Sequence, residues 1–322
     1  MAKLITGGMG YIGAELAHIL ADRGEEVVLF DININRYRIE DIESKVKVVR
    51  GDLGNLSEVL NVVKNNNITE IYHTGSMLTY MSELNPWASY QSNVIGSYNV
   101  LEAARLFNVE KMMFTSTLGT FGLQRDEVLT DISIQRPITI YGCGKLYIEG
   151  LGRFYSKKFG LDFRSIRYAH MIGPNVRTPG HWAPTMIEDA ISGKSNECIY
   201  GAPETVISMI YVRDAAKAAD MVLQAPKDSI KMMNYNVAGI PSVVSAKELE
   251  TFLAKRFPKT KVTYKLDPSL QTLHGRHATM KAFDDSYARR EWGWKPQYAN
   301  IEAIINIFEK DMNEYPKRYG LI

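Results

Sequence analysis

Residues 3–13 read Lys-Leu-Ile-Thr-Gly-Gly-Met-Gly-Tyr-Ile-Gly, and this stretch decides the fold. A short apolar run enters a turn in which Gly7, Gly10 and Gly13 have the spacing GxxGxxG, and an amphipathic run follows. Glycine suits these positions because the turn is tight and its backbone must approach a pyrophosphate closely. The first N–H groups of the following helix add a partial positive charge for the phosphates. A glycine triplet alone is also typical of an ordinary turn, but between a strand and a helix it predicts a dinucleotide site.

The end of the next predicted strand supports this interpretation. Asp31 follows the apolar run at 26–30, and an acid at this position accepts hydrogen bonds from the hydroxyls of an adenosine ribose. Its charge repels a 2′-phosphate, so the sequence favours NAD over NADP. Asp52, in the Gly-Asp-Leu after the third strand, is a candidate for the adenine edge, with a helix N-cap as an almost equally good interpretation.

Short apolar runs alternate with longer amphipathic ones through the first half of the chain. Alternation of this kind predicts parallel strands joined by helical crossovers, which is an α/β fold with a doubly wound parallel Rossmann sheet. The predicted strands lie at 3–6, 26–30, 46–50, 70–73, 111–116 and 161–168, and the predicted helices at 11–23, 57–65 and 87–107.

Beyond residue 172 the chain changes character. Gly and Pro interrupt it at 173–184, 200–205 and 238–242, and helices are predicted at 246–256 and 300–315. We predict an NAD-binding Rossmann domain over 1–170. Residues 171–322 are expected to form mainly a smaller, partly interleaved substrate-binding lobe, with one or more strands returning to the sheet.

Composition limits the possible classes of protein. The chain has 322 residues, 45% of them hydrophobic and 23% charged, with 38 basic and 36 acidic side chains. That balance predicts a large buried core and gives no reason to expect nucleic acid or a membrane as partner. No apolar run reaches the roughly 20 residues that span a bilayer, and Cys143 and Cys198 form no pair or cluster. We expect a cytoplasmic protein with free thiols and no metal site.

Tyr141 and Lys145 form a Tyr-x-x-x-Lys motif at the start of a helical stretch. A spacing of four places both side chains on one face of a helix. A free tyrosine has a pKa of about 10, and a nearby ammonium lowers that pKa so that the phenolate can take the proton of an alcohol. Thr117, after the fifth strand, is placed to orient the alcohol oxygen. A chance surface pair is the alternative, and the order of glycine turn, threonine and Tyr-x-x-x-Lys argues against it.

With these motifs, the sequence resembles the extended short-chain dehydrogenase/reductases over nearly its full length. The stretches that carry the resemblance are TGGMGYIG, Asp31, GDL, IYHTGS, NVIGSYNVLEAAR, FTSTLGTFG and YGCGK. It implies an NAD-dependent enzyme in which Thr117, Tyr141 and Lys145 are catalytic, and a homodimer formed through a four-helix bundle from the helices near 87–107 and 145–160. It implies cofactor contacts at Gly7, Gly10, Tyr11, Ile12, Gly13, Asp31, Asp52, Leu53, His73, Thr74, Gly75, Asn93, Tyr141, Lys145, Tyr168 and His170.

The second half is most similar to the short-chain-type L-threonine 3-dehydrogenases of that family. The similar stretches include FGLDFRSIRY, MNYNVAGIPSVVSAKEL and, most specifically, FDDSYARREWGWKPQY at 283–298. The resemblance implies hydride transfer from a secondary alcohol, with a 3-hydroxy amino acid such as L-threonine, or a related small hydroxy compound, as the substrate. Ser76, Thr79 and Thr117 are then expected to face the substrate.

Two positions depart from the pattern of that subfamily. The subfamily has a Gly-Thr-Thr-Asp-Tyr type loop where this chain reads GHWAP at 180–184, and His170 replaces a smaller residue beside the nicotinamide. We expect His181 and Trp182 to contact the substrate, with simple packing as the alternative for both.

Two other functions compete with the dehydrogenase. A nucleotide-sugar 4-epimerase or dehydratase would use the same Thr/Tyr/Lys chemistry. Such enzymes usually carry an arginine for the diphosphate where this chain reads ISM at 207–209, which weakens that alternative. A non-catalytic dinucleotide sensor is the third hypothesis, and the complete Thr/Tyr/Lys set argues against it because a sensor has no need of these residues.

Overall fold

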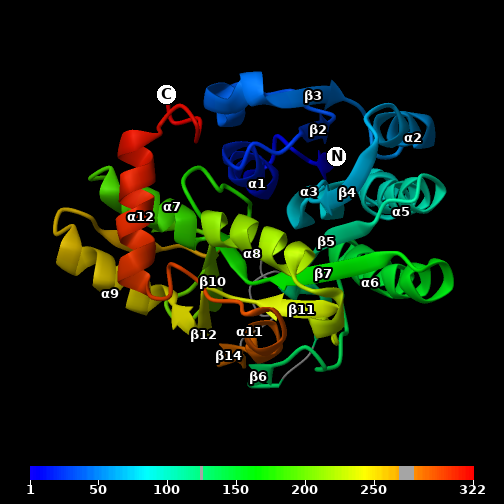
Figure 1. Ribbon diagram of the computed structural model, residues 1–322. Helices are drawn as coiled ribbons and strands as arrows, with labels where there is room; N and C mark the ends of the chain where they lie inside the picture. The colour runs from blue at the N-terminus through cyan, green and yellow to red at the C-terminus, as the bar shows by residue number, and fades with distance from the viewer. Residues whose placement is uncertain (124–125, 268–278) are drawn as a thin grey trace.

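A seven-stranded sheet with the strand order β11-β7-β5-β4-β1-β2-β3 forms the centre of the computed structural model, which describes residues 1–123, 126–267 and 279–322 (Figure 1). All six neighbouring pairs are parallel. The order runs outward from β1 in both directions, so the predicted doubly wound α/β fold is confirmed. The strands are β1 (Ala2–Thr6), β2 (Val27–Asp31), β3 (Val46–Arg50), β4 (Ile68–His73), β5 (Lys111–Thr117), β7 (Asp162–Tyr168) and β11 (Asn234–Val237).

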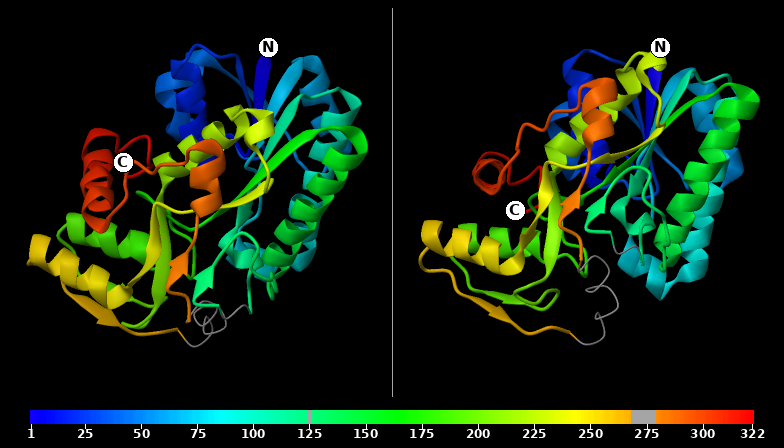
Figure 2. Two further views of the ribbon diagram at one scale, coloured as in Figure 1. Left: turned by 60° about the horizontal axis from the view of Figure 1, so that its bottom comes forward. Right: turned by 90° about the horizontal axis from the view of Figure 1, so that it is seen from below.

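Helices cover both faces of this sheet (Figure 2). One face carries α1 (Tyr11–Asp22), α8 (Val212–Gln224) and the 3-10 segment η1 (Arg36–Lys45), and the other carries α2 (Leu56–Asn65), α5 (Gly96–Leu106) and α6 (Ile140–Phe159). Because both faces are covered, the strands between them are apolar on both sides. Strand β2 shows this plainly, since residues 27–30 are all buried.

The helix predicted over 87–107 is divided into three parts. It begins as α4 (Pro86–Ser89), passes through the π-helical turn η2 (Tyr90–Ile95) and continues as α5. A short helix, α3 (Thr79–Leu84), precedes it. Single π-helical turns often occur at functional sites because they re-aim a side chain, and this one contains Asn93.

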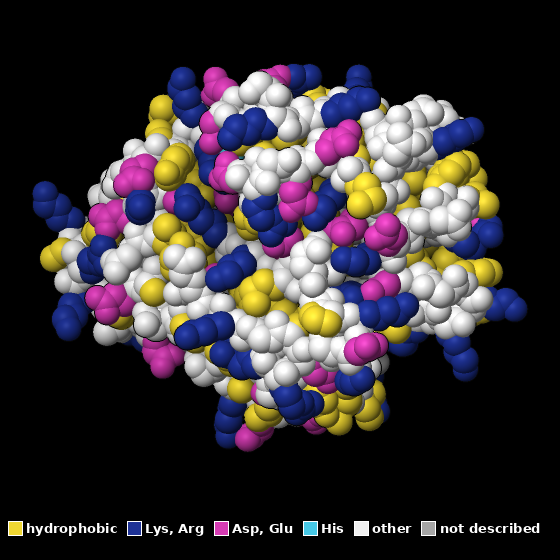
Figure 3. All heavy atoms as spheres, in the orientation of Figure 1, with side chains coloured by type: hydrophobic (Ala, Val, Ile, Leu, Met, Phe, Trp, Pro, Cys, Tyr) yellow, Lys and Arg dark blue, Asp and Glu magenta, His cyan; other side chains and the backbone are white. Residues whose placement is uncertain are grey.

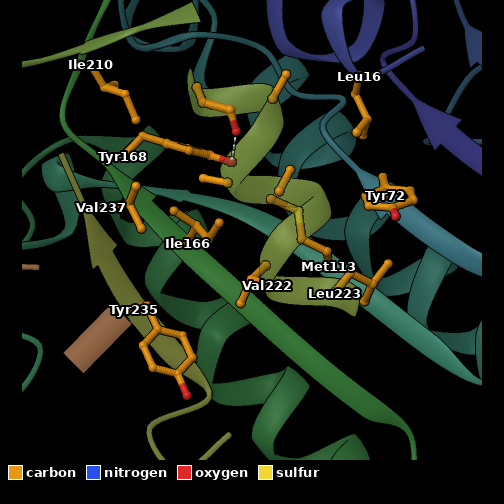
Figure 4. Packing of buried hydrophobic residues seen from close by; sticks show 14 of the residues in the cluster. Leu16, Tyr72, Met113, Ile166, Tyr168, Ile210, Val222, Leu223, Tyr235 and Val237 are labelled. Atoms are coloured by element: carbon orange, nitrogen blue, oxygen red, sulfur yellow. Dashed lines mark hydrogen bonds between the residues drawn. The ribbon is translucent and has the colours of Figure 1, made fainter. Parts of the chain in front are cut away.

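The core between α8 and the sheet is closely packed (Figure 4). Ile166 of β7 and Val222 of α8 are fully buried there. Tyr168, at the end of β7, is only 5% exposed, and its hydroxyl donates a hydrogen bond to the Ala215 carbonyl at 2.9 Å. The side chain of Tyr168 therefore belongs to this core, and only its backbone can face a ligand.

A second layer of structure lies beside the large sheet. It is built on a five-stranded sheet of β6 (Val128–Leu129), β14 (Ala282–Phe283), β12 (Ile240–Ser245), β10 (Val206–Tyr211) and β8 (His170–Ile172). Three helices pack against it: α7 (Ala183–Ile191), α9 (Ala246–Arg256) and α12 (Ile301–Glu314). The remaining elements are α11 (Ser286–Trp292), the pair β9 (Asn196–Cys198) and β13 (Val262–Tyr264), and the short 3-10 turns η3 (Leu118–Thr120) and η4 (Lys227–Ser229).

Side chains at the helix ends explain where several helices begin. Thr139 caps α6 by accepting from the Gly142 N–H, and Asn300 caps α12 by accepting from the Ala303 N–H. Ser245 forms a capping box with Glu248 at the start of α9. Gly160 ends α6 in the left-handed conformation, with a φ of 79°.

The surface mixes the two signs of charge. On the face shown in Figure 3, Lys and Arg side chains lie among Asp and Glu side chains without a block of either sign. None of the helices in the described ranges is long and apolar enough to cross a membrane.

Candidate active site

The glycine turn after β1 is packed too closely for any larger residue. Gly7 has a φ of +65°, and a Cβ on it would lie 2.5 Å from the Cα of Gly75 in the turn after β4. A Cβ on Gly13, in the first turn of α1, would lie 2.3 Å from the Gly7 carbonyl oxygen. The two turns and the start of α1 thus meet at the point where the strand order reverses, which is where doubly wound folds bind dinucleotides.

Backbone hydrogen bonds hold the Asp31 side chain against this turn. Its Oδ2 accepts a hydrogen bond from the Met9 N–H and its Oδ1 accepts one from the Asn33 N–H, both at 3.0 Å. A carboxylate has about four acceptor positions. The carboxylate therefore keeps acceptor capacity for the hydroxyls of a ribose.

Tyr11 links the start of α1 to the second layer. Its hydroxyl donates to the Asn175 carbonyl at 2.6 Å, and the guanidinium of Arg38 lies 4.3 Å from the centre of its ring. Burial raises the pKa of Tyr11, so the phenol stays protonated and remains a donor. Ile12, the next residue, is half-buried against the core below.

Asp52 and Leu53 lie at the start of the segment before α2. Asp52 is exposed and accepts from the Gly54 N–H at 2.8 Å, whereas the N-cap of α2 is Asn55. The N-cap interpretation of Asp52 is therefore wrong. Leu53 lies directly over Gly75, since a Cβ on that glycine would come within 2.8 Å of the leucine Cδ1.

His73 is fully buried at the end of β4, with both ring nitrogens occupied. Because the Ser97 hydroxyl donates to the Asn93 carbonyl, it accepts from Nε2 of His73 at 2.8 Å. Nδ1 then accepts from the Thr6 hydroxyl at 2.6 Å. Burial, and secondly the charge of Lys145, lowers the pKa of His73 to about 3. The ring is a neutral structural group, so only the backbone of His73 is left to contact a ligand.

Thr74, the next residue, donates from its hydroxyl to the Thr6 carbonyl at 2.7 Å.

Asn93 holds the loop that follows β4. Its Oδ1 accepts from the Met77 N–H at 2.7 Å and its Nδ2 donates to the Met77 carbonyl at 2.9 Å. The side chain is 2% exposed. The π-helical turn thus aims Asn93 at the segment that carries Ser76, while Thr79 lies half-buried at the first position of α3.

Tyr141, Thr117 and Ser76 meet at one point. The Ser76 and Thr117 side chains lie near the Tyr141 hydroxyl, close enough for both to act on its pKa. Burial raises the pKa of Tyr141 to about 12, and these two polar neighbours oppose that rise. Three elements converge here, because Thr117 ends β5, Ser76 follows β4 and Tyr141 lies in the first turn of α6.

Lys145 lies one turn further along α6 and is 2% exposed. Its Nζ donates to the Thr115 carbonyl at 2.7 Å and lies 5.5 Å from the centre of the Tyr141 ring. Burial lowers the pKa of Lys145 to about 7, and the charge of Glu149 opposes the change. The structure therefore brings the predicted Thr117, Tyr141 and Lys145 together at the carboxyl end of β5.

The two histidines near the end of β7 are neighbours. The ring centres of His170 and His181 lie 5.6 Å apart. His181 donates from Nε2 to the Met171 carbonyl at 2.6 Å, and burial lowers its pKa to about 4, so the ring is neutral at pH 7. Its Nδ1 is buried with no hydrogen-bond partner among the described residues. His170 is half-buried, with Nδ1 3.3 Å from the Ser208 carbonyl.

Trp182 lies in the core of the second layer. Its side chain is 2% exposed and stacks against Gly201, where an added Cβ would lie 2.8 Å from the indole Cδ1. The indole thus packs, as the alternative interpretation has it.

Sequence analysis missed a buried acid in this region. Glu149 has no exposed surface and pairs with Arg167 of β7 through two hydrogen bonds, at 2.9 and 2.7 Å. The signal was available, because Glu149 continues the four-residue spacing of Tyr141 and Lys145. Its partner on β7 was not readable, since no local pattern joins the two positions.

Comparison with known proteins identifies the class to which this fold and site belong. The family model described as the NAD dependent epimerase/dehydratase family matches residues 3–238, and the chain belongs to this family. It is an NAD-dependent oxidoreductase of the extended short-chain dehydrogenase/reductase type, as its sequence predicted.

Several individual proteins are similar to this chain over most of its length. The mitochondrial L-threonine 3-dehydrogenase of Bos taurus is 33% identical over 310 residues, which are 94% of this chain and 81% of that protein. The solved structure of a GalE-like L-threonine dehydrogenase from Cupriavidus necator, in its holo form, superposes with a TM-score of 0.86 at 26% identity, covering 96% of this chain and 99% of that one. The UDP-glucose 4-epimerase of Lactobacillus helveticus is 25% identical, and the match covers 99% of this chain and 99% of that protein.

Proposed function

We propose that this protein oxidises the hydroxyl of L-threonine, or of a closely related 3-hydroxy amino acid, and reduces NAD. The observation that carries the proposal is the meeting of the Tyr141, Thr117 and Ser76 side chains beside Lys145. The identity with the bovine L-threonine 3-dehydrogenase over most of both chains supports the choice of substrate.

The residues around the glycine turn fit a dinucleotide. Gly7 and Gly13 allow a turn so close that a Cβ on either would collide with backbone, and α1 begins with its N–H groups at this turn. Asp31 would accept from the adenosine ribose, while Asp52 and Leu53 would border the adenine. Further contacts are proposed for Gly10, Tyr11, Ile12, Thr74, Gly75 and Asn93, and for the backbone of His73, Tyr168 and His170.

Each catalytic side chain has a distinct task in this proposal. Thr117 and Ser76 hold the substrate hydroxyl where the Tyr141 oxygen can take its proton. Lys145, as an ammonium, lowers the pKa of Tyr141 and favours the phenolate. Bound NAD supplies the carbon that accepts the hydride. Lys145 itself is 2% exposed, and a low-polarity environment strengthens the effect of its charge on the tyrosine.

The second layer would select the substrate. We propose that residues 171–322 form mainly the substrate-binding lobe beside an NAD-binding domain over 1–170. Thr79, His170 and His181 would then border the substrate, and Trp182 would support them from the core.

A nucleotide-sugar 4-epimerase is the second candidate, because the epimerase of Lactobacillus helveticus also matches the whole chain. Its oxidation step would use the same three residues and then return the hydride. The segment at 207–209 opposes it: Ile207 and Met209 are apolar and buried, and the Ser208 hydroxyl donates to the Ile240 carbonyl at 2.7 Å. No cation of this segment is available for a diphosphate.

A panel assay separates these functions. Purified protein with NAD is given L-threonine, L-allo-threonine, L-serine and 3-hydroxybutyrate, and NADH absorbance is followed. In parallel, UDP-glucose is tested for conversion to UDP-galactose. We expect NADH with L-threonine and no epimerisation. Epimerisation without NADH would replace the proposal with the second candidate, and turnover of none of these compounds would remove it.

We further propose a homodimer formed through α4–α5 and α6 of each copy. Large apolar side chains are exposed along these helices, and Figure 3 shows hydrophobic side chains over α5 and α6. These side chains are Trp87, Tyr90, Tyr98, Leu106, Tyr147, Phe154 and Phe159. Light scattering should give about twice the 36.4 kDa chain mass. The variant Phe154→Arg should give the monomer, and a monomeric parent protein would contradict the dimer.

A cytoplasmic location remains part of the proposal. It rests on the two cysteines, which are both free: Cys143 is exposed and Cys198 is buried. A persistent exposed thiol fits a reducing compartment. Cell fractionation with an antibody against the protein tests this location.

A further inference from the structure

Glu149 is buried beside the site without a task in the mechanism above. Its Oε1 accepts from the Ser116 hydroxyl at 2.5 Å and from Nε of Arg167 at 2.9 Å, while its Oε2 accepts from Nη2 of Arg167 at 2.7 Å. Both charged side chains are at most 3% exposed. Desolvation makes a buried ion pair costly, so its presence gives weak evidence for stability and calls for another explanation.

Three residues of α6 face β5 at intervals of four. Tyr141, Lys145 and Glu149 lie on one face of the helix. Each lies against one of three consecutive β5 residues: Tyr141 lies near Thr117, Lys145 donates to the Thr115 carbonyl and Glu149 accepts from the Ser116 hydroxyl. Glu149 is thus the third member of the row that contains the catalytic pair.

Further contacts of Arg167 hold Glu149, the last residue of this row, in place. Arg167 also donates from Nη1 to the Asp131 carbonyl at 3.0 Å, so the pair ties α6 to β7 and to the segment before the helix. Arg167 lies next to Tyr168, whose backbone pairs with Thr117 across the sheet. A change at Glu149 would therefore act on β5 and β7, the two strands whose ends, Thr117 and Tyr168, pair beside the site.

Few charged groups face Lys145. On its own helix these are Glu149 and the ionisable Tyr141; from β4 it is His73, which is neutral. Arg167 on β7 and Asp131 before α6 lie behind Glu149, and Glu83 of α3 accepts from the Ile140 N–H at the start of α6. Glu149 is the only one of these groups whose charge supports the ammonium form of Lys145.

We propose that Glu149 is a positioning residue, whose carboxylate, held by Arg167 and Ser116, sets α6 against β5 and keeps Lys145 an ammonium beside the Tyr141 ring. The proposal rests on the catalytic roles assigned above to Tyr141 and Lys145. Burial works against the ammonium and lowers its pKa to about 7, so loss of the Glu149 charge lowers that pKa further. At neutral pH, Lys145 would then lose the charge that favours the phenolate.

The decisive readout is the titration of Lys145 itself. Protein labelled with [ε-13C]lysine is titrated by NMR in the presence and absence of NAD, and the Lys145 signal is assigned by its absence from Lys145→Met. In Glu149→Gln the Lys145 pKa should fall by about one unit or more, because a full charge on the next turn of the helix has this effect at an effective dielectric constant near 20. Glu149→Asp retains the charge and should leave the titration close to that of the parent protein.

Two further variants keep the test decisive. Glu102→Gln removes a glutamate that bonds to Tyr155 at the other end of α6, and should leave Lys145 unchanged. If Glu149→Gln does not fold, Glu149→Gln with Arg167→Gln leaves no unpaired arginine, and Lys145 should again titrate lower. An unchanged Lys145 titration in the folded variant without Glu149, or equal shifts in Glu149→Asp and Glu149→Gln, would overturn the proposal.

Enzyme kinetics provide a second test that is independent of the NMR titration. If L-threonine is oxidised, Glu149→Gln should lower kcat about tenfold or more with little change in KM, and the acid limb of the pH profile should move to lower pH, because loss of a negative charge eases deprotonation. If the parent protein oxidises none of the compounds, the function is wrong while the NMR titration still decides the role of Glu149.

Discussion

The Nζ of Lys145 lies 5.5 Å from the centre of the Tyr141 ring and donates to the Thr115 carbonyl at 2.7 Å. The β5 backbone thus holds the ammonium beside the ring, while Ser76 and Thr117 lie near the phenol oxygen. A charged group and two hydroxyl groups on different elements therefore act on the same tyrosine. This division lets each contribution be removed separately.

Replacing Tyr141 with Phe should remove the proton acceptor and leave the ring in place. General-base catalysis contributes about 10²- to 10⁴-fold to rate, so kcat for NADH formation should fall by at least that range. The affinity for NAD, measured by fluorescence titration of NADH, should change less than threefold. Retention of more than a tenth of the activity would show that another group takes the proton.

Replacing Gly13 with Ala should abolish dinucleotide binding. The added Cβ would lie 2.3 Å from the Gly7 carbonyl oxygen, and neither backbone can move without opening the turn. Calorimetry with NAD should show no binding at concentrations that saturate the parent protein. Gly150→Ala is the matched control, because a Cβ at that helical position meets only the Arg153 side chain at 3.9 Å; it should bind NAD normally.

Asp131 should make the protein less stable as the pH rises. Burial raises the pKa of this carboxyl from 3.8 to about 7. Between about pH 4 and pH 7 the folded chain therefore binds a proton that the unfolded chain has released, and this stabilisation is lost as the pH rises through 7. Asp131→Asn should retain an acceptor for the Asn236 N–H and remove the effect. The free energy of unfolding in urea at pH 5 and pH 8 should drop by about 2 kcal/mol more in the parent than in the variant.

Trp182 and Trp87 offer a matched pair of substitutions. Trp182→Ala removes a side chain that is 2% exposed and should cost about 3–5 kcal/mol of unfolding free energy. Trp87 is 68% exposed, so Trp87→Ala should cost under about 0.5 kcal/mol in the monomer. Urea unfolding of dilute samples measures both. Equal costs would mean that Trp182 is not packed in the core as described.

Local sequence patterns predicted most of the strands and helices in the first half of the chain. The predicted strand at 46–50 and helix at 246–256 agree with β3 and α9 at both ends, and the predicted helix at 11–23 differs from α1 by one residue. The segment at 87–107 was predicted as one helix, whereas the structure has a π-helical turn at 90–95, from which Asn93 bonds to Met77. The 3-10 segment at 36–45 was not predicted at all.

The sequence by itself determined the doubly wound sheet, the glycine turn and the identity of the Tyr141–Lys145 pair. Each of these depends on residues a few positions apart, where steric limits and helical spacing act directly. Only the tertiary structure decided that Trp182 and the His73 ring face the core and that Glu149 meets Arg167. Those contacts join segments far apart in the chain, and the burial that gives them their energy exists only once the layers have packed.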